Sequence, residues 1–165
     1  MKNLKLFPFV FFAFFSFSVN AQTYISGFIN ANTNWTVAGN PYIVTSNALV
    51  SQGYTLTIDP GVIVKFNPSC ALQIDGQLIA VGTPASHITF TSNISSSPGA
   101  WDKLHFSGYC VGANFDANGN YLSGSIVKYA DVLYAGGVGY GAVHIESSWP
   151  YLSHCTVRLS KAAGI

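Results

Sequence analysis

A short triplet of apolar, polar and apolar residues recurs along the chain at intervals of sixteen residues. Its four copies are Leu56-Thr57-Ile58, Leu72-Gln73-Ile74, Ile88-Thr89-Phe90 and Leu104-His105-Phe106. This alternation is typical of a short β-strand whose two outer side chains point inward and whose middle side chain points outward. A single strand of this kind cannot bury its inner face alone. A repeat at a fixed period therefore predicts that successive copies stack on one another.

Turn-forming residues follow each triplet, as in Asp59-Pro60 and Asp75-Gly76. The apolar runs at 62–66 and 78–81 fit a second strand in each repeat. We therefore predict a β-solenoid with a sixteen-residue period, in which Leu56, Leu72, Ile88 and Leu104 form one inward file. A β-sandwich accommodates the same strands but does not explain why equivalent positions recur at sixteen.

The register is interrupted by a polar stretch rich in Gly and Asn, which predicts a loop inserted at about 108–125. The pattern resumes at Val127-Lys128-Tyr129 and Val143-His144-Ile145. The expected organisation is an N-terminal cap region over 22–45 and stacked coils over 46–165. Because Gly164-Ile165 reads as the start of another coil, we expect an uncapped C-terminus and a longer parent protein.

The first residues have the pattern of a secretory signal peptide. Lys2 and Lys5 precede an apolar run over 6–19, and cleavage is expected near Ala21. The run is shorter than the roughly 20 residues that a membrane-spanning helix needs, and no later segment is apolar for long enough. The sequence therefore predicts a secreted, extracellular or cell-surface protein without a transmembrane segment in the mature chain.

Composition beyond residue 21 supports an extracellular all-β domain and excludes a nucleic-acid partner. Five basic and six acidic residues remain there, which provide no sustained positive surface. Gly, Ser, Thr, Asn and β-branched residues are abundant. The cysteines Cys70, Cys110 and Cys155 lack metal or redox spacing; small buried thiols are favoured, and one disulfide is the alternative.

The run from Asn34-Trp35-Thr36 to Val44, followed by LTIDPGVIVKF, LQIDGQLIAVGTP and HITFTS, resembles the first coils of secreted bacterial right-handed parallel β-helix proteins. These belong to the pectate-lyase-like superfamily in its broad sense. The resemblance implies an all-β, single-stranded right-handed parallel β-helix with a capped N-terminus. It also implies that polysaccharides bind along the outward strand face.

Stacked coils align the outward residues into a candidate ligand-facing column: Thr89, His105, Lys128, His144 and Glu146. Candidate sugar-stacking aromatics lie in or beside the insert: Trp101, Tyr109 and Tyr121. An extracellular glycan or another surface is the expected partner. The predicted function is a structural or adhesion scaffold that binds glycans; the alternative is the N-terminal part of a polysaccharide lyase or glycoside hydrolase with catalytic coils beyond residue 165.

No catalytic residue, metal or cofactor is assigned from the sequence, because clustered carboxylates of the kind that glycosidases use do not occur. Calcium between stacked Asp59 and Asp75 is an alternative to separate turn-closing roles. The stretch 116–120 starts like a calcium loop, but lacks its later ligands and predicts an Asn-Gly turn. Zinc at His105 and His144 is a further hypothesis, although neither spacing nor partners fit a zinc site.

Overall fold

A computed structural model describes residues 22–165, so the predicted signal peptide over 1–21 lies outside the described residues. The described chain is all-β, with one short 3-10 helix, η1 (Val37–Gly39), and no α-helix. Its strands are β1 (Thr23–Ile29), β2 (Thr33–Trp35), β3 (Tyr42–Val50), β4 (Thr55–Ile58), β5 (Ile63–Phe66), β6 (Leu72–Ile74), β7 (Gln77–Val81), β8 (Ile88–Ser92), β9 (Leu104–Phe106), β10 (Asn114–Phe115), β11 (Tyr121–Ser123), β12 (Ile126–Lys128), β13 (Ala130–Leu133), β14 (Val143–Ile145), β15 (Tyr151–Ser153) and β16 (Thr156–Arg158).

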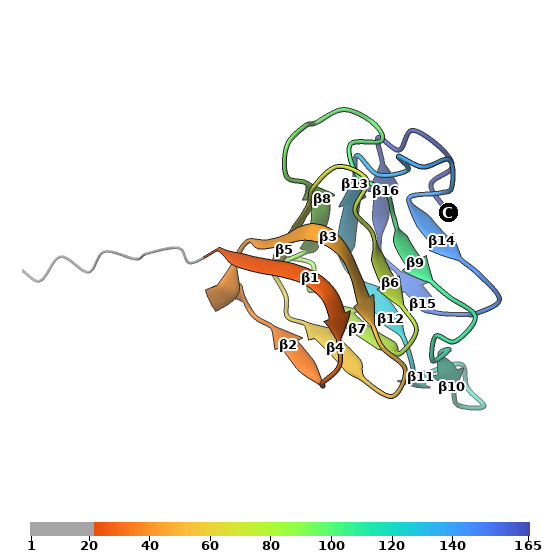
Figure 1. Cartoon of the computed structure of the whole chain (residues 1–165). Helices are drawn as coiled ribbons and strands as arrows, with labels where there is room; N and C mark the ends of the chain where they lie inside the picture. The colour runs from red at the N-terminus through yellow and green to blue at the C-terminus, as the bar shows by residue number, and fades with distance from the viewer. Residues whose placement is uncertain (1–21) are drawn as a thin grey trace, which may run out of the picture.

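Two parallel sheets enclose the core (Figure 1). The nine-stranded sheet has two arms that meet at β3, because the first half of this strand pairs with β5 and the second half with β6. One arm continues through β8, β13 and β16, and the other through β9 and β14. The five-stranded sheet, in the order β15-β12-β7-β4-β2, forms a third face.

The chain visits these three faces in rotation. After β5, β6 and β7, it returns as β8, β9 and β12, which pair in parallel with β5, β6 and β7 respectively. The next circuit, β13, β14 and β15, pairs in parallel with β8, β9 and β12. Each face therefore receives one strand per circuit, which places residues from distant parts of the chain side by side.

The predicted sixteen-residue stacking register is wrong. Leu56 pairs with Leu78, Leu72 with Leu104, and Ile88 with Ala130. A short strand and its turn together take about eight residues, so an interval of sixteen usually advances the chain by two of the three faces. Leu72 and Leu104 share a file because the long loop at 93–103 adds further residues between β8 and β9.

The predicted inward orientation of the triplets is confirmed. All eight apolar triplet residues are at most 1% exposed: Leu56, Ile58, Leu72, Ile74, Ile88, Phe90, Leu104 and Phe106. The core also contains Cys70 and Cys110, while Cys155 is partly buried. All three are free thiols, and burial raises the pKa of each.

The predicted cap region and insert both contain strands. Residues 22–45 include β1 and β2, which add edge strands beside β3 and β4. The insert forms the antiparallel hairpin β10–β11 between β9 and β12. No helix within residues 22–165 combines the length and apolar character needed to cross a membrane.

Candidate functional site

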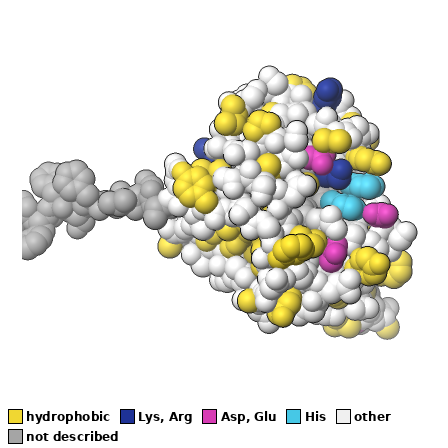
Figure 2. All heavy atoms as spheres, viewed as in Figure 1, with side chains coloured by type: hydrophobic (Ala, Val, Ile, Leu, Met, Phe, Trp, Pro, Cys, Tyr) yellow, Lys and Arg dark blue, Asp and Glu magenta, His cyan; other side chains and the backbone are white. Residues whose placement is uncertain are grey.

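A polar pocket lies on the outward face of β6, β9 and β14. Gln73, His105 and His144 occupy the central position of these strands and are register partners across the face. Their pocket, here called the histidine pocket, has a volume of about 450 Å³. Its lining comprises Asn47, Ala71, Gln73, Asp102, Lys103, His105, Tyr140, His144 and Glu146. Figure 2 shows histidine, basic and acidic side chains gathered at the right of the view.

Three rings form a continuous stack along one wall of the pocket. The centroids of His105 and His144 are 4.8 Å apart with planes 13° from parallel, and those of His144 and Tyr140 are 4.7 Å apart with planes at 17°. Lys103 Nζ lies 4.5 Å from the Tyr140 centroid. Both faces of His144 are therefore covered, so a ligand at this wall meets the edge of the His144 ring.

Four polar side chains of the pocket form two close pairs. His105 Nε2 lies 3.0 Å from Glu146 Oε2, and Lys103 Nζ lies 3.1 Å from Asp102 Oδ2. The side chains of Lys103 and Asp102 are each 12% exposed, whereas that of Glu146 is 59% exposed. The lysine pair is thus shielded from water, and the glutamate faces outward.

His144 is held towards its neutral form. Burial lowers its pKa, and the neighbouring His105 and Lys103 lower it further, against the opposing effects of Glu146 and Asp102. Its Nδ1 atom is buried and makes no hydrogen bond to the described residues. A neutral imidazole avoids placing a charge at this unpaired position.

The structure divides the predicted ligand-facing column. His105, His144 and Glu146 meet in the histidine pocket, but Thr89 lies on β8 beside Asp131, and Lys128 lies on β12 beside Val81 and Ser153. The five residues thus do not form one column, because β8 and β12 belong to the other two faces.

Sequence reasoning missed several pocket residues, namely Asn47, Asp102, Lys103 and Tyr140. Lys103 could have been found, because the alternation that points His105 outward also applies two residues earlier. Tyr140 lies in the glycine-rich loop between β13 and β14, where no strand alternation predicts its direction. Asn47 lies in the middle of β3, between the segments that pair with β5 and β6, where the regular alternation of the strand is interrupted.

The three predicted sugar-stacking residues have different environments. Trp101 is fully buried: its ring stacks on Phe66 at a centroid distance of 4.0 Å, and its Nε1 donates to the Leu133 carbonyl at 2.7 Å. The assignment of Trp101 to sugar stacking is therefore wrong. Tyr121 is partly buried and stacks on Tyr151, whereas Tyr109 is 70% exposed.

The cation sites that were alternatives at the sequence level do not assemble in the described chain. Asp59 follows β4 and Asp75 follows β6, so they lie on different faces and are not stacked partners. Asp75 Oδ1 accepts hydrogen bonds from Gln73 at 2.8 Å and Ser107 at 2.7 Å. Asp116 Oδ1 accepts backbone N–H groups of Asn118 and Asn120, as in a closed turn. Within residues 22–165 no group of three or more His, Cys, Asp or Glu side chains is placed to hold a metal ion.

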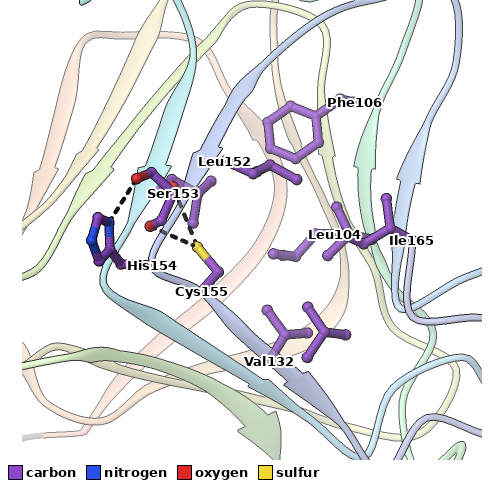
Figure 3. Close-up of a pocket in the computed structure, with 11 residues that line it drawn as sticks. Leu104, Phe106, Val132, Leu152, Ser153, His154, Cys155 and Ile165 are labelled. Carbon is purple, nitrogen blue, oxygen red and sulfur yellow. Dashed lines mark hydrogen bonds between the residues drawn. The ribbon is translucent and has the colours of Figure 1, made fainter.

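A second cavity is apolar and lies inside the sheets, next to the edge strands β14, β15 and β16. Its volume is about 210 Å³, and its walls include Leu104, Phe106, Val132, Leu152 and Ile165 (Figure 3). Cys155 Sγ turns to the carbonyls of Val127 and Ser153. This cavity continues the core and has little polar chemistry to offer a ligand.

Comparisons with known proteins leave the family open. No family model matches the chain, and no solved structure matches it. A segment of 58 residues, which is 35% of this chain, is 41% identical to a part of the Drosophila melanogaster protein named bark beetle. The match covers about 2% of that protein's length.

Proposed function

We propose that the chain is an exported right-handed parallel β-helix module that serves as a scaffold or adhesion element and binds glycans at the histidine pocket. The return of each strand to the same face in parallel register supports the β-helix. Handedness is supported by the general rule that about 98% of parallel crossover connections are right-handed. Export is supported by the charged and apolar N-terminal pattern in residues 1–21.

The histidine pocket is the observation that carries the binding proposal. Its polar groups converge on an open space large enough for a sugar ring, and the central three, Gln73, His105 and His144, come from adjacent strands of one face. Sugar hydroxyls donate and accept hydrogen bonds; amide and neutral imidazole groups can also do both, and a carboxylate accepts. Two largely exposed aromatic residues elsewhere on the molecule, Tyr109 and Trp149, provide further stacking surfaces.

A glycan array with the full protein tests this function. His105→Ala removes the central pocket residue and should weaken binding about tenfold, which corresponds to the loss of one or two hydrogen bonds. His87→Ala is the matched control, because His87 contacts Asp131 at 3.2 Å on another face. Equal binding by wild type and His105→Ala, or no binding to any glycan, would contradict the proposal.

A polysaccharide lyase or glycoside hydrolase is the second candidate. The favouring observation is the 3.0 Å contact between His105 and Glu146 at the edge of a pocket, since an imidazole beside a carboxylate can accept a proton. A lyase would generate a new double bond that absorbs ultraviolet light, and a hydrolase would release reducing ends. Incubation of the protein with polysaccharides, followed by both readouts, distinguishes an enzyme from a binding module.

A further inference from the structure

We propose that the histidine pocket selects uncharged glycans and disfavours glycans that carry uronate or sulfate groups. This inference rests on the proposed glycan-binding function and assigns a substrate class to the same site. It follows from the signs of the charges that line the pocket, and from which hydrogen-bonding groups are already in use.

The charged groups give the pocket an excess of negative charge when the imidazoles are neutral. Two carboxylates, Asp102 and Glu146, then face one ammonium, that of Lys103. A third carboxylate, Asp75, is hydrogen-bonded to Gln73 on the pocket lining. The local field therefore opposes an incoming anion.

The single ammonium on the pocket lining, that of Lys103, is already paired with a carboxylate of the protein. Lys103 Nζ lies 3.4 Å and 3.1 Å from the two carboxylate oxygens of Asp102, and 4.5 Å from the centre of the Tyr140 ring. The Lys103 side chain is only 12% exposed. An anionic sugar would have to displace a shielded contact before it could use this charge.

The groups that remain for a ligand suit hydroxyls. Asn47 Oδ1 accepts the N–H of Ala71, which leaves the amide N–H groups of Asn47 as donors. Gln73 Nε2 donates to Asp75, which leaves Gln73 Oε1 as an acceptor, and exposed Glu146 is a further acceptor. A carboxylate or sulfate ligand is acceptor-only, whereas a hydroxyl satisfies donors and acceptors together.

The size of the discrimination follows from Coulomb's law. A ligand that places a unit negative charge about 5 Å from one uncompensated carboxylate in water binds about fourfold more weakly than an uncharged ligand. The effect is screened, because the Debye length falls from about 10 Å at 0.1 M salt to about 3 Å at 1 M. Discrimination should therefore be strongest in dilute buffer and above the pH range in which histidine titrates.

Titration calorimetry with the full protein at about pH 8 and low salt tests the inference. The probes are hexasaccharides of glucose, mannose and N-acetylglucosamine, and uronate hexasaccharides from polygalacturonate and alginate. We expect an uncharged probe to bind at least about fourfold more tightly than the uronates. Glu146→Gln should reduce this ratio about fourfold. Asp131→Asn, which removes the carboxylate of the equivalent His87 contact on another face, should leave the ratio unchanged.

The outcomes separate the two proposals. Uronates that bind as tightly as the uncharged probes, or a ratio unaffected by Glu146→Gln, would overturn the charge selection and leave glycan binding intact. Absence of binding to either class would overturn the proposed function, and this inference with it. A ratio reduced equally by Glu146→Gln and Asp131→Asn would assign the effect to net protein charge instead of the pocket.

Discussion

Substitutions at Trp101 distinguish a role of this residue in the core from a role in ligand binding. Its buried indole stacks on Phe66 with planes 8° from parallel, and Nε1 donates to the Leu133 carbonyl at 2.7 Å. Replacement of a buried Trp by Ala typically costs about 3–5 kcal/mol. Phe keeps most of the packing, so Trp101→Phe mainly removes the donor to the partly buried Leu133 carbonyl, at about 1–3 kcal/mol. We expect Trp101→Ala to lower the free energy of unfolding by about 4 kcal/mol and Trp101→Phe by about 1.5 kcal/mol.

Urea unfolding followed by far-ultraviolet circular dichroism measures both losses without relying on Trp fluorescence. In a domain of this size about 1 kcal/mol shifts Tm by about 2–4 °C, so Trp101→Phe should melt about 3–6 °C lower. Trp149→Ala, at a 70% exposed indole, is the control and should change the free energy of unfolding by about 0.5 kcal/mol or less. Wild-type stability of Trp101→Ala together with lost glycan binding would refute the core assignment.

Three further predictions concern a turn, a titrating group and the insert. Gly76→Ala should destabilise by about 1–3 kcal/mol, because an added Cβ would meet the backbone carbonyls of Ser51 and Tyr54; Gly108→Ala, with 3.6 Å to the nearest atom, should show little change in Tm. Burial lowers the pKa of His144 in the folded state, so the unfolded chain binds a proton at His144 more readily than the folded chain does. The stability that neutral His144 contributes is therefore complete above about pH 6.5, the pKa of an unperturbed histidine. This stability is lost as the pH falls through the folded-state pKa. His144→Gln should therefore flatten the decline in Tm between about pH 7 and pH 5, and an unchanged slope would contradict this. Asp116→Ala should speed amide hydrogen exchange at Asn118 and Asn120 without altering Tm, because the Asp116 carboxylate bonds only within its own exposed turn; unchanged exchange would argue against the turn.

The pocket residues show how far sequence reasoning reached. The sequence predicts that His105, His144 and Glu146 point outward, since alternation within each strand is a local property. Thr89 and Lys128, which the predicted column also contains, lie on the other two faces, because an interval of sixteen residues is not a full circuit. His105 and His144 meet only because the chain passes through β12 and β13, with the β10–β11 insert, between β9 and β14.

The aromatic residues show that the local sequence does not predict whether a side chain in a loop is buried. Tyr109 and Trp101 both flank polar turns, and nothing in their immediate sequence separates an exposed ring from a buried one. Trp101 is buried because the loop before β9 folds back and places its ring on Phe66, which is an interaction between successive circuits.

By itself the sequence determined which side chains of each strand face inward, where the turns occur and where the insert interrupts the strands, because these depend on neighbouring residues along the backbone. The tertiary structure alone decided which strands are neighbours, and hence that two histidines, a glutamate and a shielded lysine share one pocket. The physical reason is that parallel register depends on the total length of chain in each circuit, including loops of unequal length, and no local alternation of residues records that length.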